Sequence, residues 1–194
     1  HLEYSQSFRI LWLLEELEVD YELKRYERDP VTHLAPDDYK AGSPTGTAPF
    51  ITDGEKVLAE SNAIVDYLLD RVPDSPLRPG PGGLDRDRYL FWLHTAQGSM
   101  MPVLLLDSIF RVIVSRVPAF LGPLFRTVFE KAKTGFSKPR LDALLELAER
   151  DLSLKPWFAG EHLTAADIVM SYAMASADQR GYLGDRPHCR AWLE

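Results

Sequence analysis

The chain has 194 residues, of which 45% are hydrophobic and 26% are charged. This balance is typical of a soluble globular protein and excludes a disordered or collagen-like chain. Lys and Arg total 22 against 29 Asp and Glu, a formal net charge of -7, without any Lys/Arg run, so we expect no nucleic-acid partner. No apolar stretch approaches the roughly 20 residues of a membrane span, so we expect no membrane association. The single cysteine rules out an internal disulfide and fits a cytoplasmic location.

The first 72 residues combine helical and strand patterns. Residues 10–17 carry apolar side chains at i, i+3, i+4 and i+7, which predicts a helix. Residues 19–24 alternate between apolar and polar side chains, which predicts a half-buried strand. A short helix is predicted around residues 36–41, and the pair Asp53-Gly54 between two apolar runs predicts a β-hairpin. The segment thus has the pattern of a small α/β domain.

A linker and a helical region follow. Ser61 or Asn62 can cap a helix that ends before Pro73. Residues 73–83 contain four prolines and three glycines, which excludes regular structure and predicts a linker. After the linker, helices are predicted over residues 84–116, 119–133, 140–152, 164–177 and 187–194. We expect Pro102 to bend the first of these helices.

These patterns predict an α/β domain over residues 1–72, the linker 73–83 and an all-helical domain over 84–194. The chain starts at His1 rather than Met and ends within a helical pattern. We therefore expect that a first strand and the end of the last helix have been trimmed.

One helix start is unusually well specified. Thr164 offers a hydroxyl at the N-cap and Asp167 a carboxylate three residues later, which is close to a capping box. We interpret this pair as a folding device and not as catalytic machinery.

Common catalytic and metal-binding motifs are absent from the sequence. The five histidines have no metal-ligand spacing, and one cysteine cannot form a zinc cluster, so no metal site is expected. The sequence contains no GxSxG elbow, no HExxH motif and no Walker loop. Any activity must therefore depend on less conspicuous residues.

A short polar run precedes the first predicted helix. The run contains Ser5 and Ser7, and the start of a helix offers unpaired N–H groups and a partial positive charge. Such a place favours an anion, including a thiolate, to which a serine hydroxyl could donate a hydrogen bond. The alternative is that either serine merely caps the helix.

Two further runs lie at strand ends. Pro49 opens a strand, where proline is tolerated, and a cis bond there would expose the backbone of Ala48. Glu60 and Ser61 lie between a strand and a helix, where a carboxylate and a hydroxyl could hold the ammonium and carboxylate groups of an amino acid. A helix cap is again the alternative.

In this order, the runs resemble the glutathione transferase family, and most closely its serine-type microbial and fungal branch. The resemblance covers nearly the whole chain. The matching segments are Ser5 four residues before Arg9, then residues 10–17, 43–49, 60–64, 98–102, 157–160 and 164–168.

The resemblance implies a thioredoxin-like N-terminal domain, an all-helical C-terminal domain and a homodimer. It also implies glutathione as co-substrate, without a bound cofactor, and a small hydrophobic electrophile as the second substrate. Ser5 would stabilise the glutathione thiolate, and Ala48 would pair its backbone with the cysteinyl part ahead of a cis Pro49. Glu60 and Ser61 would hold the γ-glutamyl end.

The resemblance further implies an electrophile pocket that includes Met100, Met101 and Leu104. One departure concerns the glycine end of glutathione. Thr47 stands where related sequences often carry Lys or Arg, and Lys40 is the substitute that we expect there.

The serine at position 5 argues against the thiol-disulfide branches of the family, which carry cysteine. Tyr4 and Ser7 remain alternative partners of the thiolate, and the four-residue step to Arg9 favours Ser5. The main alternative to an enzyme is a non-catalytic glutathione-binding, ligand-carrying or regulatory protein of the same fold. A pure dimerisation module is a third class.

Overall fold

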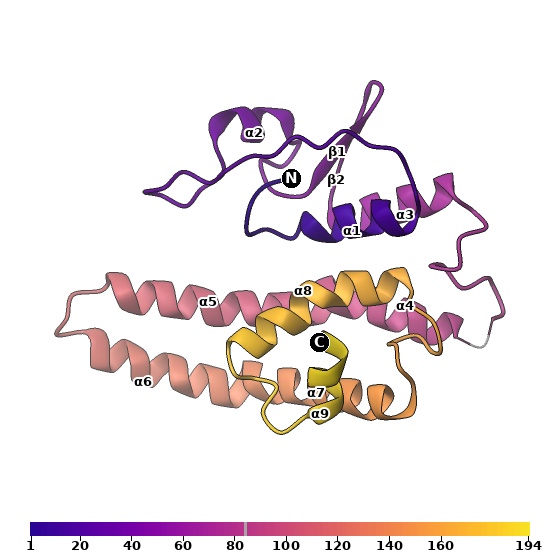
Figure 1. The fold of residues 1–194 in the computed structure, drawn as a ribbon. Helices are drawn as coiled ribbons and strands as arrows, with labels where there is room; N and C mark the ends of the chain where they lie inside the picture. Colours follow the sequence, from indigo (N-terminus) through magenta and orange to yellow (C-terminus); the bar gives the residue numbers. More distant parts are fainter. Residues whose placement is uncertain (84) are drawn as a thin grey trace. The chain divides into compact units, whose positions relative to one another are not determined.

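The computed structural model describes residues 1–83 and 85–194, and the chain divides into two compact units, His1–Arg86 and Asp87–Glu194. Over the described residues, the first unit combines three helices with one hairpin (Figure 1). Its elements in chain order are α1 (Phe8–Glu16), α2 (Asp37–Gly42), β1 (Phe50–Asp53), β2 (Lys56–Ala59) and α3 (Ser61–Arg71).

The predicted hairpin is confirmed. β1 and β2 pair antiparallel, with Phe50 opposite Ala59 and Asp53 opposite Lys56. The two-residue turn between them needs a positive φ, and Gly54 supplies it at +59°.

The helix predicted from the spacing of residues 10–17 is also confirmed, and its apolar side chains lie in the core of the first unit. Leu13 of α1 is fully buried, as are Ile64 and Val65 of α3. α1 and α3 pack against each other (Figure 1). Burial of such side chains contributes roughly 1.5–3 kcal/mol each.

The predicted strand over residues 19–24 is wrong. The segment is extended but forms no ladder, and Tyr21 and Leu23 are 40% and 46% exposed. The alternation of apolar and polar side chains fits a strand, but a strand forms only where a second backbone segment supplies hydrogen-bonding partners. Instead, residues 19–24 and β1 both line one cavity of about 1290 Å³. Parallel pairing starts only beyond the segment, at a single bridge between Leu2 and Tyr26.

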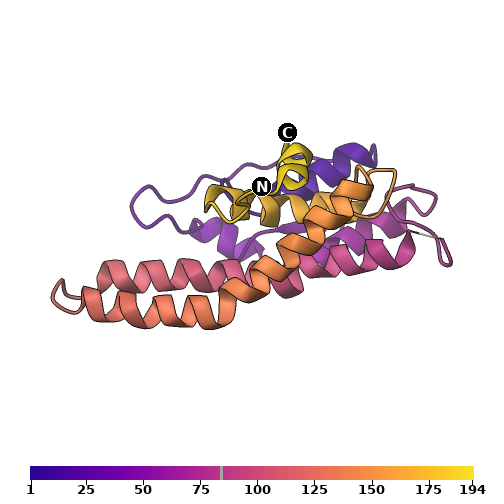
Figure 2. The same ribbon diagram turned by 90° about the horizontal axis from the view of Figure 1, so that it is seen from below.

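The second unit is helical throughout its described regular elements, as predicted. The elements are α4 (Arg86–Thr95), η1 (Ala96–Met100), α5 (Met101–Arg116), α6 (Gly122–Ala132), η2 (Lys133–Ser137), α7 (Lys138–Leu154), α8 (Ala165–Gln179) and α9 (Pro187–Leu193). α5 and α6 lie side by side and antiparallel (Figures 1 and 2). α8 is the most buried helix of this unit, with eleven buried residues among its fifteen.

The irregularity expected at Pro102 takes the form of a π-helical turn. η1 lies directly before α5, in which Pro102 occupies the first turn. Pro139 occupies the first turn of α7 in the same way, directly after η2. A proline has no N–H to donate to the carbonyl four residues earlier. In both places a π-helical turn therefore precedes the proline, and regular α-helix resumes there.

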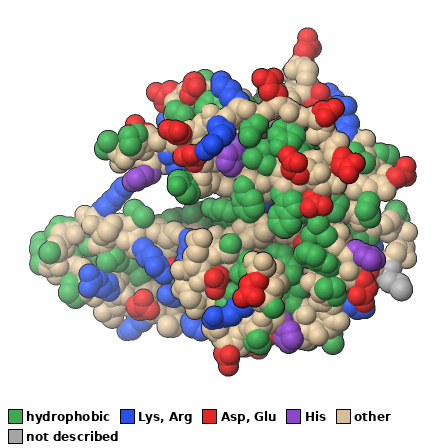
Figure 3. All heavy atoms as spheres, viewed as in Figure 1, with side chains coloured by type: hydrophobic (Ala, Val, Ile, Leu, Met, Phe, Trp, Pro, Cys, Tyr) green, Lys and Arg blue, Asp and Glu red, His purple; other side chains and the backbone are tan. Residues whose placement is uncertain are grey.

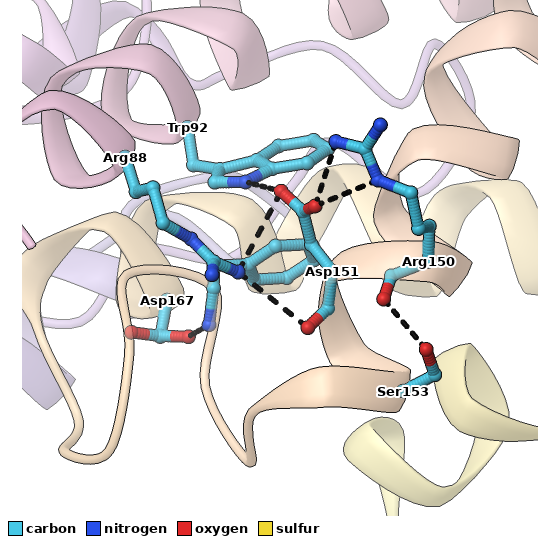
Figure 4. A network of polar contacts seen from close by, with 7 residues as sticks. Arg88, Trp92, Arg150, Asp151, Ser153 and Asp167 are labelled. Atoms are coloured by element: carbon cyan, nitrogen blue, oxygen red, sulfur yellow. Dashed lines mark hydrogen bonds and ion pairs between the residues drawn. The ribbon is translucent and has the colours of Figure 1, made fainter.

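A buried polar network joins α4 to α7 (Figure 4). The indole N–H of Trp92 donates to Asp151 Oδ2 at 3.1 Å, and Arg150 Nη2 lies 3.0 Å from Asp151 Oδ1. Arg88 Nη2 adds an ion pair to the same carboxylate at 3.6 Å. Since the carboxylate has both a cation and N–H donors, its burial is compensated.

The predicted capping box at α8 is confirmed. The Thr164 N–H and hydroxyl donate to Asp167 Oδ2 at 2.9 and 2.8 Å. Asp167 Oδ1 also accepts the Phe158 N–H at 2.8 Å, so the carboxylate fixes the preceding loop as well. Burial raises the pKa of the Asp167 carboxyl, although the N–H donors of Phe158 and Thr164 oppose the rise.

α5 carries an apolar face, although the sequence contains no long uninterrupted run of apolar residues. The continuous helical stretch Arg86–Arg116 has an 18-residue window of mean hydropathy 1.5, of which 17% is buried. By length and composition alone it could cross a membrane, but a helix of a soluble protein passes the same test. The window is not uniformly apolar, however, because the buried Asp107 pairs with Arg111 at 3.0 Å and Lys133 at 3.5 Å.

The face shown in Figure 3 carries side chains of both charges, with hydrophobic side chains between them.

Candidate functional site

The candidate site starts in the turn before α1. Ser5 and Ser7 are both buried, at 8% and 5% exposure. The Ser5 hydroxyl donates to the Leu2 carbonyl at 2.7 Å, and its oxygen accepts the Ser7 N–H at 3.2 Å. The two hydroxyl oxygens lie 2.8 Å apart. The Ser7 side chain makes no capping bond to α1, so the hydroxyls bind this turn and each other.

Tyr4 lies on the outside of the same turn. Its φ is +49° and its side chain is 90% exposed. The phenol therefore extends into solvent, whereas the two serine hydroxyls lie inside the turn. This arrangement favours a serine over Tyr4 as the partner of a bound sulfur.

A second part of the site lies at the start of α3. Glu60 has a φ of +72° and an exposed side chain, and Ser61 is 2% exposed. The Ser61 hydroxyl oxygen accepts a hydrogen bond from Arg9 Nη2 at 2.9 Å. That bond occupies the oxygen and leaves the Ser61 proton for another acceptor.

Arg9 connects the two parts. Its side chain starts on α1, is fully buried, and donates to the carbonyl and side-chain oxygens of Gln6 as well as to Ser61. One planar guanidinium can serve several acceptors in fixed directions. The sequence had provided only the spacing of Arg9 from Ser5; its role as a buried bridge depends on contacts 52 residues apart, which no local pattern reveals.

The third part is the loop before β1. The Ala48–Pro49 peptide bond is cis, as the resemblance implied. Pro49 is buried and Ala48 is partly exposed. The Ser43 hydroxyl donates to the Thr47 carbonyl at 2.9 Å and so fixes the loop that leads into the cis bond.

Lys40 lies on α2 and is paired with the exposed Asp37 at 3.0 Å. Thr47 is exposed, and its hydroxyl oxygen is 2.8 Å from that of Thr45. A contact from Lys40 to the glycine end of glutathione would require Lys40 to exchange Asp37 for the ligand.

The residues expected in the electrophile pocket belong to the second unit. Met100 and Leu104 are buried, and Met101 is partly exposed. The pocket stays a prediction. Within residues 1–83 and 85–194, no three His, Cys, Asp or Glu side chains gather as metal ligands.

Comparison with known proteins identifies the family. Residues 1–70 match the model of the glutathione S-transferase N-terminal domain, and residues 134–194 match that of the C-terminal domain. The chain belongs to the glutathione S-transferase family. The thioredoxin-like N-terminal domain and the helical C-terminal domain expected from the sequence are thus confirmed.

Known glutathione S-transferases align with this transferase over nearly its whole length. It is 32% identical to glutathione S-transferase 3 of Schizosaccharomyces pombe, with all of this chain and 79% of that protein covered. It is 29% identical to glutathione S-transferase 1 of Saccharomyces cerevisiae, with 86% of that protein covered. A crystal structure of a glutathione S-transferase from Actinobacillus pleuropneumoniae is 30% identical, with a TM-score of 0.78, and covers 99% of this chain and 82% of that one.

Proposed function

We propose that this transferase binds reduced glutathione in its first unit, stabilises the thiolate with Ser5 and transfers it to a small apolar electrophile, the chemistry of detoxification. One observation carries the proposal: the buried Ser5 turn and the start of α3 lie in one unit and are joined through Arg9. Family membership supports glutathione as the substrate. The single, buried Cys189 is compatible with a cytoplasmic location.

The γ-glutamyl end would bind at Glu60 and Ser61. The first N–H groups of the 11-residue α3 have no intrahelical partners and attract a carboxylate. The Ser61 proton can add a hydrogen bond, because its oxygen already accepts one from Arg9. The exposed Glu60 carboxylate would attract the ammonium group, and the Ala48 backbone ahead of Pro49 would pair with the cysteinyl part.

The mechanism follows from the chemistry of thiols. An ordinary thiol has a pKa of about 8.5, so only a few per cent is thiolate near neutral pH. Lowering that pKa by about 2 units requires about 2.7 kcal/mol of thiolate stabilisation. One hydrogen bond to a charged group supplies about 1.5–3 kcal/mol, and a helix start about 0.3–1 kcal/mol more. Ser5 and the start of α1 are therefore sufficient, without a general base.

The direct test is the pKa of bound glutathione, followed by thiolate ultraviolet absorbance. Ser5→Ala should raise this pKa by about one to two units, because about 1.5–3 kcal/mol of thiolate stabilisation is lost. Glutathione affinity should change less, since other residues hold the rest of the tripeptide. Tyr4→Phe is the control and should match wild type. A raised pKa in Tyr4→Phe with an unchanged one in Ser5→Ala would transfer the role to Tyr4.

The electrophile would bind beside the sulfur. Of the three residues that the resemblance assigns to its pocket, Met101 is partly exposed and can add apolar surface, whereas Met100 and Leu104 are buried. An activity panel covering conjugation, peroxide reduction and ether cleavage would identify the reaction class. Glutathione binding without turnover across the panel would instead indicate a carrier or regulatory protein.

We also propose a homodimer, which family resemblance implies and two exposed apolar stripes support. The stripes have helical spacing, and their side chains are 44–81% exposed. They comprise Leu105, Ile109 and Val112 on α5, and Phe120, Leu124 and Val128 at and along α6. Exposed apolar side chains in helical rows of this kind favour a protein–protein contact. Light scattering at micromolar concentration should give a dimer for wild type.

The matched variants for this test are Leu124→Glu and Leu34→Glu. Leu124 is 60% exposed within a stripe, and Leu34 is 57% exposed outside both stripes. Leu124→Glu should yield monomers and Leu34→Glu should not. A monomeric wild type would contradict the proposal.

A further inference from the structure

Ser5 lies within a chain of three short contacts. His1 Nδ1 is 2.8 Å from Ser7 Oγ, Ser7 Oγ is 2.8 Å from Ser5 Oγ, and Ser5 Oγ is 2.7 Å from the Leu2 carbonyl oxygen. Each contact joins two atoms that repel unless a proton lies between them. Three contacts therefore need three protons, and the direction of each can be worked out.

The two hydroxyls supply only two of these protons. The backbone N–H groups of Leu2 and Ser7 point to Ser7 Oγ and Ser5 Oγ, each at 3.2 Å, but they occupy lone pairs and place no proton within the three contacts. The third proton must come from His1 Nδ1. His1 then donates to Ser7, Ser7 to Ser5, and Ser5 to Leu2, and each hydroxyl accepts two bonds and donates one.

The opposite direction fails this count. If His1 Nδ1 lacked a proton, it would take the Ser7 proton. The single proton of Ser5 could then serve either Ser7 or Leu2, which would leave two oxygens at 2.7 or 2.8 Å without a proton between them. Buried oxygens in this position cost free energy because water cannot relieve them.

We propose that Ser7 and His1 are positioning residues that fix the direction of the Ser5 proton, an inference that rests on the proposed function. Because Ser7 donates to Ser5, the Ser5 proton cannot turn back toward Ser7. It points to the Leu2 carbonyl in the free protein. When glutathione binds it turns to the sulfur, because a hydrogen bond to a charged thiolate is stronger than one to a neutral carbonyl and offsets the loss of the Leu2 bond. Donation into the Ser5 oxygen also polarises its O–H bond, which strengthens the bond to a thiolate.

The test measures the pKa of bound glutathione in Ser7→Ala, His1→Leu and His1→Asn. Ser7→Ala and His1→Leu should each raise it by about half a unit, a roughly three-fold smaller thiolate fraction at a pH below the pKa. The Asn side chain keeps an N–H donor near the position of Nδ1, so His1→Asn should return close to wild type. The KM for glutathione should change little in all three, while kcat falls in the first two.

The matched control is Ser115→Ala, which removes an exposed hydroxyl that donates to the Val112 carbonyl at 2.8 Å; it should leave the pKa unchanged. Far-ultraviolet circular dichroism checks folding, and if Ser7→Ala does not fold, the His1 pair decides.

A raised pKa in Ser5→Ala with wild-type values in Ser7→Ala and His1→Leu would overturn the inference and leave the proposed function intact. Equal shifts in His1→Leu and His1→Asn would overturn the donor role of His1. A larger shift in Ser7→Ala than in Ser5→Ala would give the sulfur contact to Ser7 and overturn the assigned roles. An unchanged pKa in Ser5→Ala would overturn the proposed function and the inference together.

Discussion

Replacing Asp167 with alanine should destabilise the second unit more than loss of an ordinary helix cap. Asp167 is fully buried and accepts three hydrogen bonds, from the Phe158 N–H and from the N–H and hydroxyl of Thr164. In Asp167→Ala the hydroxyl can turn to another acceptor, but both backbone N–H groups are left buried. Each orphaned group costs about 1–3 kcal/mol, so we expect a loss of about 2–6 kcal/mol. Thr164→Ala should cost only about 0.5–2 kcal/mol.

The assay is urea unfolding at neutral pH followed by tryptophan fluorescence, since Trp92, Trp157 and Trp192 all lie in the second unit. Activity per folded molecule should stay near wild type in both variants. Asp167→Ala that unfolds like wild type but has no turnover would refute the reasoning and make the carboxylate part of the site.

Asp167→Asn tests the electrostatics of the same position. Burial raises the pKa of the Asp167 carboxyl, so the folded state binds the proton more tightly than the unfolded state. The contribution of this group to stability is therefore full below about pH 4 and is lost as the pH rises through the folded-state pKa. The unfolding free energy of wild type minus that of Asp167→Asn should grow as the pH falls through this window. A difference of opposite slope would mean that the pKa is lowered instead.

Three further predictions concern single side chains. Arg9→Lys should lower the urea midpoint by the equivalent of about 1.5–3 kcal/mol, because an ammonium cannot reach Gln6 and Ser61 together; an unchanged midpoint would contradict the bridging role. Ser61→Ala should weaken glutathione binding about ten-fold or more in titration calorimetry, and equal affinities would remove Ser61 from the site. Burial, with the neighbouring Glu149, raises the pKa of the Cys189 thiol to about 12, so dithiobis(nitrobenzoic acid) should label the unfolded but not the native protein at neutral pH.

Local patterns in the sequence predicted the elements whose stabilisation is local. The apolar spacing of residues 10–17, the Asp53-Gly54 turn and the Thr164 cap each depend on residues within a few positions of one another, and all three are confirmed. The segment 19–24 shows the limit of this reasoning. Its alternation describes one strand, but strand pairing depends on a second backbone that the pattern does not contain.

The candidate site divides in the same way. Ser5, Pro49 and Ser61 could be singled out because each stands next to a recognisable element boundary. The guanidinium of Arg9, which joins two of these boundaries, and the contact of Ser7 with His1 could not be foreseen, since they follow from side-chain directions within the folded turn. The direction of hydrogen bonds in the site can thus be inferred only from the three-dimensional structure.

The predicted linker, residues 73–83, is not a free spacer along its whole length. Its first part is fixed to the first unit, because Leu77 is 4% exposed and Arg78 pairs with Asp66 and Asp70 at 3.0 and 2.5 Å. Proline and glycine content alone would mark these residues as an accessible spacer, whereas their contacts make them part of the folded surface of the first unit. Proteases that cut mobile segments should therefore spare residues 75–79 of the native protein.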